Sequence, residues 1–183
     1  MKNREDEEQN IYIILSFTGA MLSRLIRLKT GDEYCHISIA LDKDLNKMYS
    51  FGRLHPYNPF WGGFVHEKIE SGTFKRFKKT KVEVYSLKVS KRQYRYIEKK
   101  IAKMENQKQI YSFNIVGLFA TGFNIKYRKT NSFYCAEFVK YLIDEANVKL
   151  NLPELIKPSD FQSLGQMTLE YRGLLSKYRH KNK

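Results

Sequence analysis

Two residues of this chain, Cys135 and His36, have side chains suited to nucleophilic catalysis. Cys135 lies in the stretch NSFYCAEFV, and His36 opens the apolar run HISIAL. A cysteine thiolate can attack a carbonyl carbon, and a neighbouring imidazole can pass a proton to the leaving group. The two residue types therefore predict acyl-transfer chemistry through a covalent acyl-enzyme, provided that folding brings them together.

Cys135 is also a candidate for a packed core position. It belongs to an apolar stripe at helical spacing, which continues with Phe138, Val139, Leu142, Ile143 and Ala146. Such a stripe predicts an amphipathic helix whose apolar face is buried. Unpaired cysteine is among the most buried residue types. The stripe alone does not distinguish a core cysteine from a nucleophile.

The residues before Cys135 favour the catalytic interpretation. Thr130, Asn131 and Ser132 are all good helix caps, so Cys135 is expected in the first helical turn. Unpaired backbone N–H groups and the helix dipole stabilise a thiolate there. The same N–H groups can receive the oxyanion of a tetrahedral intermediate.

The two cysteines are expected to have different roles. Consecutive strand residues point to opposite faces, so Cys35 is expected to face away from His36 and to be a core cysteine. A disulfide between Cys35 and Cys135 is a weaker alternative, in conflict with this geometry. His36 itself can be read as the base or as a hydrogen-bonded structural histidine.

The order of these motifs resembles a known superfamily. The succession SRLIRLKTGDEYCHISIALDKDLNKMYSFGR, a basic middle region and then NSFYCAEFV is similar to circularly permuted papain-like proteins of NlpC-like and YiiX-like type. In that superfamily the histidine strand precedes the cysteine helix. The resemblance spans roughly residues 11–165.

The resemblance implies roles for individual residues. Cys135 matches the nucleophile and His36 the base, and a third polar residue on the next strand orients the imidazole. Ser50 in MYSFGR is the closest match to that third position. A serine hydroxyl can accept the imidazole N–H but orients it less well than a carboxylate, so a Cys/His dyad and a degenerate enzyme are alternatives. His55, His66 and Glu67 rank below Ser50, with His66 and Glu67 read as an exposed pair on a sheet edge.

The resemblance further implies a cysteine peptidase, amidase or acyltransferase that acts on an amide or ester bond. Its substrates would be peptide amides of cell-wall fragments or lipid-linked acyl groups. No cofactor is expected, and no metal site, because no Cys/His cluster has zinc spacing. The chain shows no secretory signal and no apolar run long enough to span a bilayer, so a cytoplasmic location is expected.

A second function class follows from the charge. The net charge is +14, with basic clusters at residues 74–81, 90–100 and 126–130. Such an excess favours contact with an anionic substrate or another polyanion. A catalytically degenerate domain whose basic face binds nucleic acid or a membrane surface is therefore the alternative function, and a merely solvated basic face is the simplest interpretation.

The elements that must position these residues predict an α+β fold in one domain. We expect that domain over residues 11–178, with flexible tails at 1–10 and 179–183. A small antiparallel sheet is predicted with helices packed mainly on one side. The resemblance implies that this is the permuted papain-like arrangement.

Individual elements follow from periodicity and turn residues. Strands are predicted at 11–17, 64–70 and 81–89, and an antiparallel hairpin at 34–53. Helices are predicted at 20–31, after a cap at Ser90 with an apolar stripe through Ile97 and Ile101, and at 113–119. Residues 54–64 hold the only Trp and are expected to form an aromatic loop, either as a lid over the site or as plain packing. Ser159 is a candidate cap for a last short turn.

Overall fold

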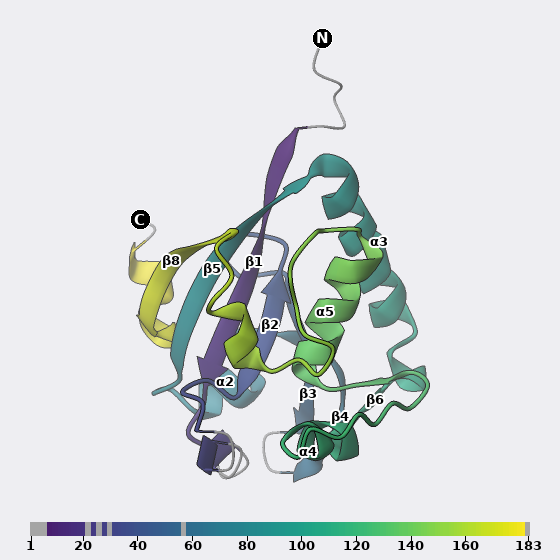
Figure 1. Ribbon diagram of the computed structural model, residues 1–183. Helices are drawn as coiled ribbons and strands as arrows, with labels where there is room; N and C mark the ends of the chain where they lie inside the picture. Colours follow the sequence, from purple (N-terminus) through teal and green to yellow (C-terminus); the bar gives the residue numbers. More distant parts are fainter. Residues whose placement is uncertain (1–6, 21–22, 25–26, 29–30, 56–57, 182–183) are drawn as a thin grey trace.

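A six-stranded antiparallel sheet forms the centre of the molecule (Figure 1). The computed structural model describes residues 7–20, 23–24, 27–28, 31–55 and 58–181. The strands lie in the order β4-β3-β2-β1-β5-β8. Their bounds are Glu8–Phe17 (β1), His36–Ala40 (β2), Met48–His55 (β3), Asn58–Glu67 (β4), Lys81–Ser90 (β5) and Met167–Leu174 (β8). The predicted α+β class is confirmed.

Helices and a second, small sheet complete the described part of the chain. The helices are α2 (Gly72–Arg76), α3 (Lys91–Asn106), α4 (Ile115–Thr121) and α5 (Cys135–Glu145). Short 3-10 turns are η1 (Lys108–Ile110), η2 (Pro158–Phe161) and η3 (Leu175–Lys181). Strands β6 (Ser112–Phe113) and β7 (Ser132–Phe133) pair in parallel just before α4 and α5.

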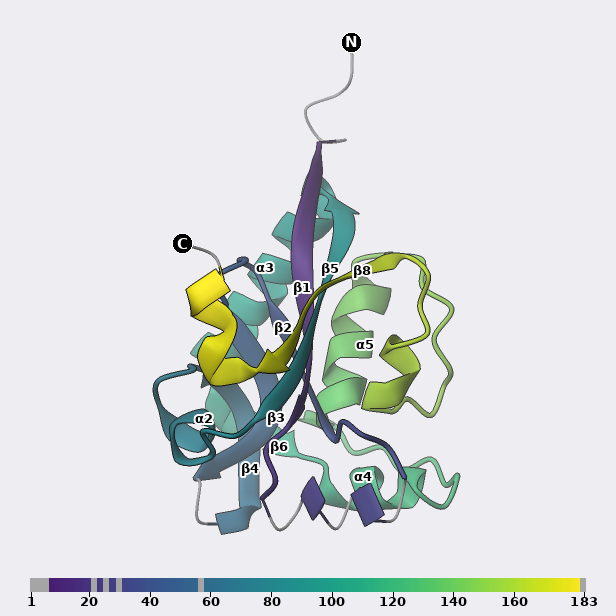
Figure 2. The ribbon, with the colours of Figure 1, turned by 90° about the vertical axis from the view of Figure 1, so that its left-hand side faces the viewer.

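Both faces of the sheet are buried. On β1, Ile11 and Ile13 pack in a cluster with α3 and α5, whereas Tyr12 and Ile14 pack in a second cluster with α2 and η3. Figure 2 shows α5 and the yellow η3 on opposite sides of the sheet. The two long helices α3 and α5 share one face, as expected of helices packed mainly on one side, and the short α2 and η3 cover the other face. Because β1 is covered on both faces, it has no side toward solvent, and its apolar run is therefore uninterrupted.

Several predicted elements are confirmed. The strand at 11–17 lies within β1, and the hairpin at 34–53 is formed by β2 and β3. Ser90 caps α3 in a capping box, in which its hydroxyl accepts from the Gln93 N–H and the Gln93 side chain accepts from the Ser90 N–H. Ile97 and Ile101 of this helix are buried as predicted.

Other boundaries differ from the predictions. β1 begins at Glu8 and η3 includes residues 179–181, so parts of both predicted tails belong to ordered elements. β8 was not predicted, because its mostly polar, exposed sequence lacks an apolar run. Ser159 lies inside η2, whose cap is Lys157. Six residues of the predicted helix at 20–31 lie outside the described residues, namely 21–22, 25–26 and 29–30, and Leu28 is exposed.

The predicted aromatic loop at 54–64 is also wrong. Its described residues belong to β3 and β4, which form a hairpin, and residues 56 and 57 lie outside the described part. The two glycines were read as loop residues, but Gly62 pairs with Arg53 inside the sheet. A Cβ at Gly62 would lie 2.7 Å from the Gly52 oxygen and 2.7 Å from Phe113 Cβ. The glycine thus permits close approach of β6 to the hairpin.

Candidate active site

The first residue of β2 and the first residue of α5 meet at one end of the sheet. These residues are His36 and Cys135, and the starts of both elements lie at the same end of the molecule in Figure 1. Cys135 lies close enough to the His36 ring to help raise the pKa of that histidine. Both line a cavity of about 130 Å³ that also contains Glu67 and Gly52. The structure therefore brings together the two residues predicted to carry the chemistry.

Glu67 is the second partner of His36. Its Oε1 lies 3.0 Å from His36 Nε2, and its Oε2 accepts a hydrogen bond of 2.5 Å from the Ser38 hydroxyl. Because Nε2 is engaged by the carboxylate, Nδ1 is the ring nitrogen left for the Cys135 sulfur. Ser38 thus holds the Glu67 carboxylate, and that carboxylate orients the His36 ring in the cavity that also contains Cys135.

The pKa values of the pair agree with an ion pair. Burial by itself would lower the pKa of His36, but the charge of Glu67 and hydrogen bonds to Cys135 and Glu67 outweigh burial and raise it to about 10. Burial would raise the pKa of Glu67, but the His36 charge and hydrogen bonds from His36 and Ser38 lower it. At neutral pH the imidazole is therefore protonated and the carboxyl ionised.

Ser50 is not the partner of the imidazole. It lies on β3, between the strands that carry His36 and Glu67, and its buried hydroxyl makes no hydrogen bond of standard geometry. It lies close enough to the Glu67 carboxyl to help lower the pKa of that group. The choice of Ser50 as third residue is thus corrected to Glu67, because the carboxylate reaches the ring across β3.

Small residues on β3 leave room for this contact. Ser50 and Gly52 are two apart on β3 and so share one face of the sheet. A Cβ at Gly52 would lie 3.4 Å from His36 Cε1 and 3.6 Å from Ser50 Oγ. A large side chain at either position would occupy the space that the imidazole and the Glu67 carboxylate use.

The interpretation of His66 and Glu67 as an exposed pair is wrong for Glu67. Its side chain is only 11% exposed, and it points to the opposite face of β4 from His66. His66 contacts Glu105 and the Asn46 oxygen, away from His36. His55 pairs with Asn58 at the end of β3, and its side chain lies outside the described part. Strand alternation on β4, which puts Glu67 on the face of Val65, was the available sequence signal for this carboxylate.

The start of α5 differs in detail from the prediction. Tyr134 is the N-cap and makes no side-chain capping bond, and Cys135 is the first helical residue. Ser132 cannot cap the helix, because it lies in β7 and its hydroxyl accepts a hydrogen bond from Ser112. Cys135 nevertheless stands in the first turn, as expected. Backbone N–H groups of this turn have no partner within the helix.

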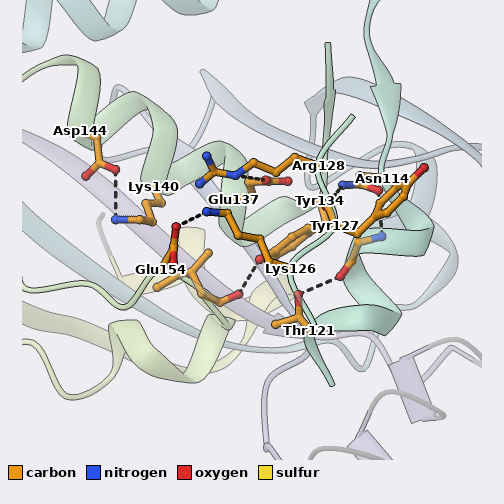
Figure 3. Close-up of polar contacts among 12 residues, drawn as sticks. Asn114, Thr121, Lys126, Tyr127, Arg128, Tyr134, Glu137, Lys140, Asp144 and Glu154 are labelled. Carbon is orange, nitrogen blue, oxygen red and sulfur yellow. Dashed lines mark hydrogen bonds and ion pairs between the residues drawn. The ribbon is translucent and has the colours of Figure 1, made fainter. Parts of the chain in front are cut away.

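Polar contacts hold the segment before α5 in place (Figure 3). The Asn114 side chain donates to the Tyr127 oxygen, and Lys126 pairs with Glu154. Arg128 lies 4.0 Å from Glu137, a first-turn residue of α5. Burial raises the pKa of Glu137, against the opposing effects of the Tyr134 N–H, Arg128 and Asn114. These contacts tie α4, the following loop and α5 into one support for Cys135.

Cys35 is buried, as expected, but lies in the same cavity as Cys135. The alternation argument fails because Cys35 precedes β2 and is not a strand residue. Its thiol donates to the Ser23 oxygen at 3.2 Å, and burial is the main cause that raises its pKa to about 11. Both cysteines are free thiols, so the alternative of a Cys35–Cys135 disulfide is contradicted.

Within the described ranges, no group of three or more His, Cys, Asp or Glu side chains is placed to hold a metal ion. None of the helices described here has the length and apolar character needed to cross a bilayer.

Comparison with known proteins adds no relative. No protein-family model matches the chain, and neither a curated protein nor a solved structure is significantly similar to it. The geometry of the site is therefore the basis for assigning a function to this chain.

Proposed function

We propose that this chain is a cysteine-dependent hydrolase or acyltransferase that acts on an amide or ester bond. One observation carries the proposal: Cys135, at the start of α5, lines the same cavity as His36, and Glu67 holds His36 at 3.0 Å. A nucleophile, a base and an orienting carboxylate in contact are the arrangement that thiol-dependent acyl transfer requires.

The chemistry begins from an ion pair between the Cys135 thiolate and the His36 imidazolium. The sulfur attacks the substrate carbonyl carbon, and the N–H groups of the first turn of α5 receive the oxyanion. The tetrahedral intermediate then collapses as His36 gives its proton to the leaving amine or alcohol, which leaves a thioester on Cys135. His36 next takes a proton from water or another acceptor, which attacks the thioester and releases the product.

We also infer the permuted papain-like arrangement as the fold. It is supported by the order of the motifs, since the histidine strand β2 precedes the cysteine helix α5, and by the packing of α5 against β2 and β3. The place of Glu67 on β4 differs from the expected position on the strand next to β2, because β3 lies between them.

The substrate class follows from the cavity and the charge. The cavity is lined partly by apolar side chains, including Phe74, Phe113 and Leu118. The net charge of +14 favours an anionic substrate. Amides of peptide or cell-wall fragments and esters of lipid-linked acyl groups both fit this description.

The test is hydrolysis of a panel of amide and ester substrates, with mass spectrometry of the acylated protein. We expect turnover and a mass adduct on Cys135, and loss of both in Cys135→Ala. The matched control is Cys35→Ala, which removes the other thiol of the same cavity and is expected to keep turnover. Equal activity of wild type and Cys135→Ala would refute the proposal.

The second candidate is a binding domain without catalysis, and the charge of +14 favours it. It predicts binding of a polyanion that weakens steeply with salt and does not depend on Cys135. Salt-sensitive binding in a protein that never forms the Cys135 adduct would support this second candidate instead.

A further inference from the structure

Exposed apolar residues gather at the end of the molecule that carries the site. Of the ten large hydrophobic residues that are exposed in the described part of the chain, five come from residues 116–127. They are Val116, Phe119, Phe123, Ile125 and Tyr127. We call residues 116–127 the apolar segment. Surface apolar residues are normal singly, whereas a contiguous group marks an interaction site.

Two of these side chains stand on one side of α4, and the other three follow the helix. Val116 and Phe119 are three residues apart and exposed, whereas Gly117 and Thr121 of the same helix are buried. Leu118 points inward and lines the cavity that holds Cys135. One short helix thus has one side in the cavity wall and the other in solvent.

A second stretch adds to this surface. Thr18 and Ser23 line the same cavity as Leu118 of α4. Figures 1 and 2 both place the end of β1 and α4 at the same end of the molecule. Farther along the chain, Arg24 and Arg27 are exposed, and Leu28 is 86% exposed.

The sequence around the apolar segment is basic, although Asp32 lines a second cavity together with Phe119. Between Glu105 and Glu137 the sequence has no acidic residue, but it has Lys108, Lys126, Arg128 and Lys129. Lys126 pairs with Glu154 and Arg128 lies near Glu137, as Figure 3 shows, and their charges are partly compensated. Lys129, Arg24 and Arg27 are in none of the ion pairs found among the described residues.

We propose that this end of the molecule docks on the surface of an anionic lipid bilayer. Exposed apolar and aromatic side chains next to Lys and Arg are the combination that inserts at a lipid interface and contacts acidic headgroups. A second copy of the chain fits worse, because a two-fold contact would set two basic surfaces against each other. Single-stranded nucleic acid could stack on Phe119, Phe123 and Tyr127, but the exposed aliphatic side chains of Val116, Ile125 and Leu28 give it no stacking partner and favour a lipid interface instead.

Docking in this orientation brings the cavity to the lipid surface, because Leu118 of α4 lines it together with Thr18 and Ser23. The proposal does not depend on the chemistry of Cys135. It is therefore tested separately, by binding alone.

The experiment is sedimentation of the full chain with vesicles of phosphatidylcholine alone or with added phosphatidylglycerol. We expect binding to the anionic vesicles and a loss of affinity of about tenfold in the double variant Val116→Ser, Ile125→Ser. The matched control is Leu169→Ser, which removes an exposed apolar side chain from β8. It is expected to bind as wild type does, and so is Cys135→Ala.

Two double variants with the same change in net charge test the contribution of the basic residues to vesicle binding. Lys129→Gln with Arg24→Gln is expected to weaken binding by about tenfold, because each basic residue near the surface adds to the attraction. Arg92→Gln with Lys99→Gln, exposed on α3, changes the net charge equally and should have little effect.

Three outcomes would overturn the proposal. They are undiminished vesicle binding by both the Val116/Ile125 and the Lys129/Arg24 variants, self-association in light scattering that the Val116 and Ile125 changes abolish, and tighter binding to single-stranded RNA than to anionic vesicles. Circular dichroism of each variant confirms that it is folded.

Discussion

Glu67 Oε1 lies 3.0 Å from His36 Nε2, although 31 residues separate them along the chain. The contact crosses β3, where Ser50 and Gly52 leave room for it. With this contact the candidate site consists of three residues, Cys135, His36 and Glu67, which line one cavity.

Replacement of Glu67 tests this arrangement of three residues. Glu67→Gln keeps the shape but removes the charge that holds the imidazolium, so we expect kcat to fall by at least about tenfold. Ser50→Ala is expected to have a smaller effect, because Ser50 touches the carboxylate and not the ring. The control is His66→Ala, the neighbouring residue on the opposite face of β4, with kcat within about twofold of wild type. Steady-state kinetics on an active substrate distinguishes these outcomes, and equal losses in all three variants would contradict the assignment.

The pKa of His36 sets an alkaline limit on stability and activity. It is raised from 6.5 to about 10, so the stabilisation that it contributes is complete below pH 6.5 and is lost as the pH rises towards 10. Glu67, with its lowered pKa, contributes stability above pH 4.5 that is lost as the pH falls through its lowered value. Titration of the His36 ring protons by NMR should show the high midpoint in wild type and a lower one in Glu67→Gln. A wild-type midpoint near 6.5 would contradict the ion pair.

The two cysteines should differ in reactivity. Burial is the main cause that raises the pKa of Cys35 to about 11, so it stays a thiol at neutral pH, whereas Cys135 stands at the start of α5 in the cavity that also holds His36. Iodoacetamide at pH 7 is expected to alkylate Cys135 at least about tenfold faster than Cys35. Peptide mapping of the alkylated protein measures both rates. Slow and equal labelling would show that Cys135 is not activated.

Gly62 is predicted to be essential for the packing of β6 against the β3–β4 hairpin. A Cβ there would lie 2.7 Å from both the Gly52 oxygen and Phe113 Cβ, so we expect Gly62→Ala to lower the free energy of unfolding by about 1–3 kcal/mol. Gly165→Ala is the control, since nothing lies within 4 Å of a Cβ at that position. Urea unfolding of the two variants gives the comparison, and equal stabilities would show that the hairpin adjusts freely.

Local patterns in the sequence predicted the helices and strands that flank the site. The stripe from Cys135 to Ala146 is buried as its spacing indicated, and Ser90 caps α3 through the Gln93 side chain. These features depend on residues within one or two turns of each other, and such short-range interactions are encoded in neighbouring letters. Features that lack an apolar pattern were missed: β8 is largely exposed, and the glycines of β4 resemble those of a loop.

The sequence by itself determined the residue types for the chemistry, namely a cysteine at the start of an apolar helix and a histidine at the start of a buried strand. Tertiary structure decided which carboxylate serves the histidine. The pairing of β4 with β3, and the small side chains between, place Glu67 on His36, whereas the nearer candidate Ser50 ends beneath the carboxylate. The register between strands depends on long-range packing, so one residue of shift would have put His66 on that face instead.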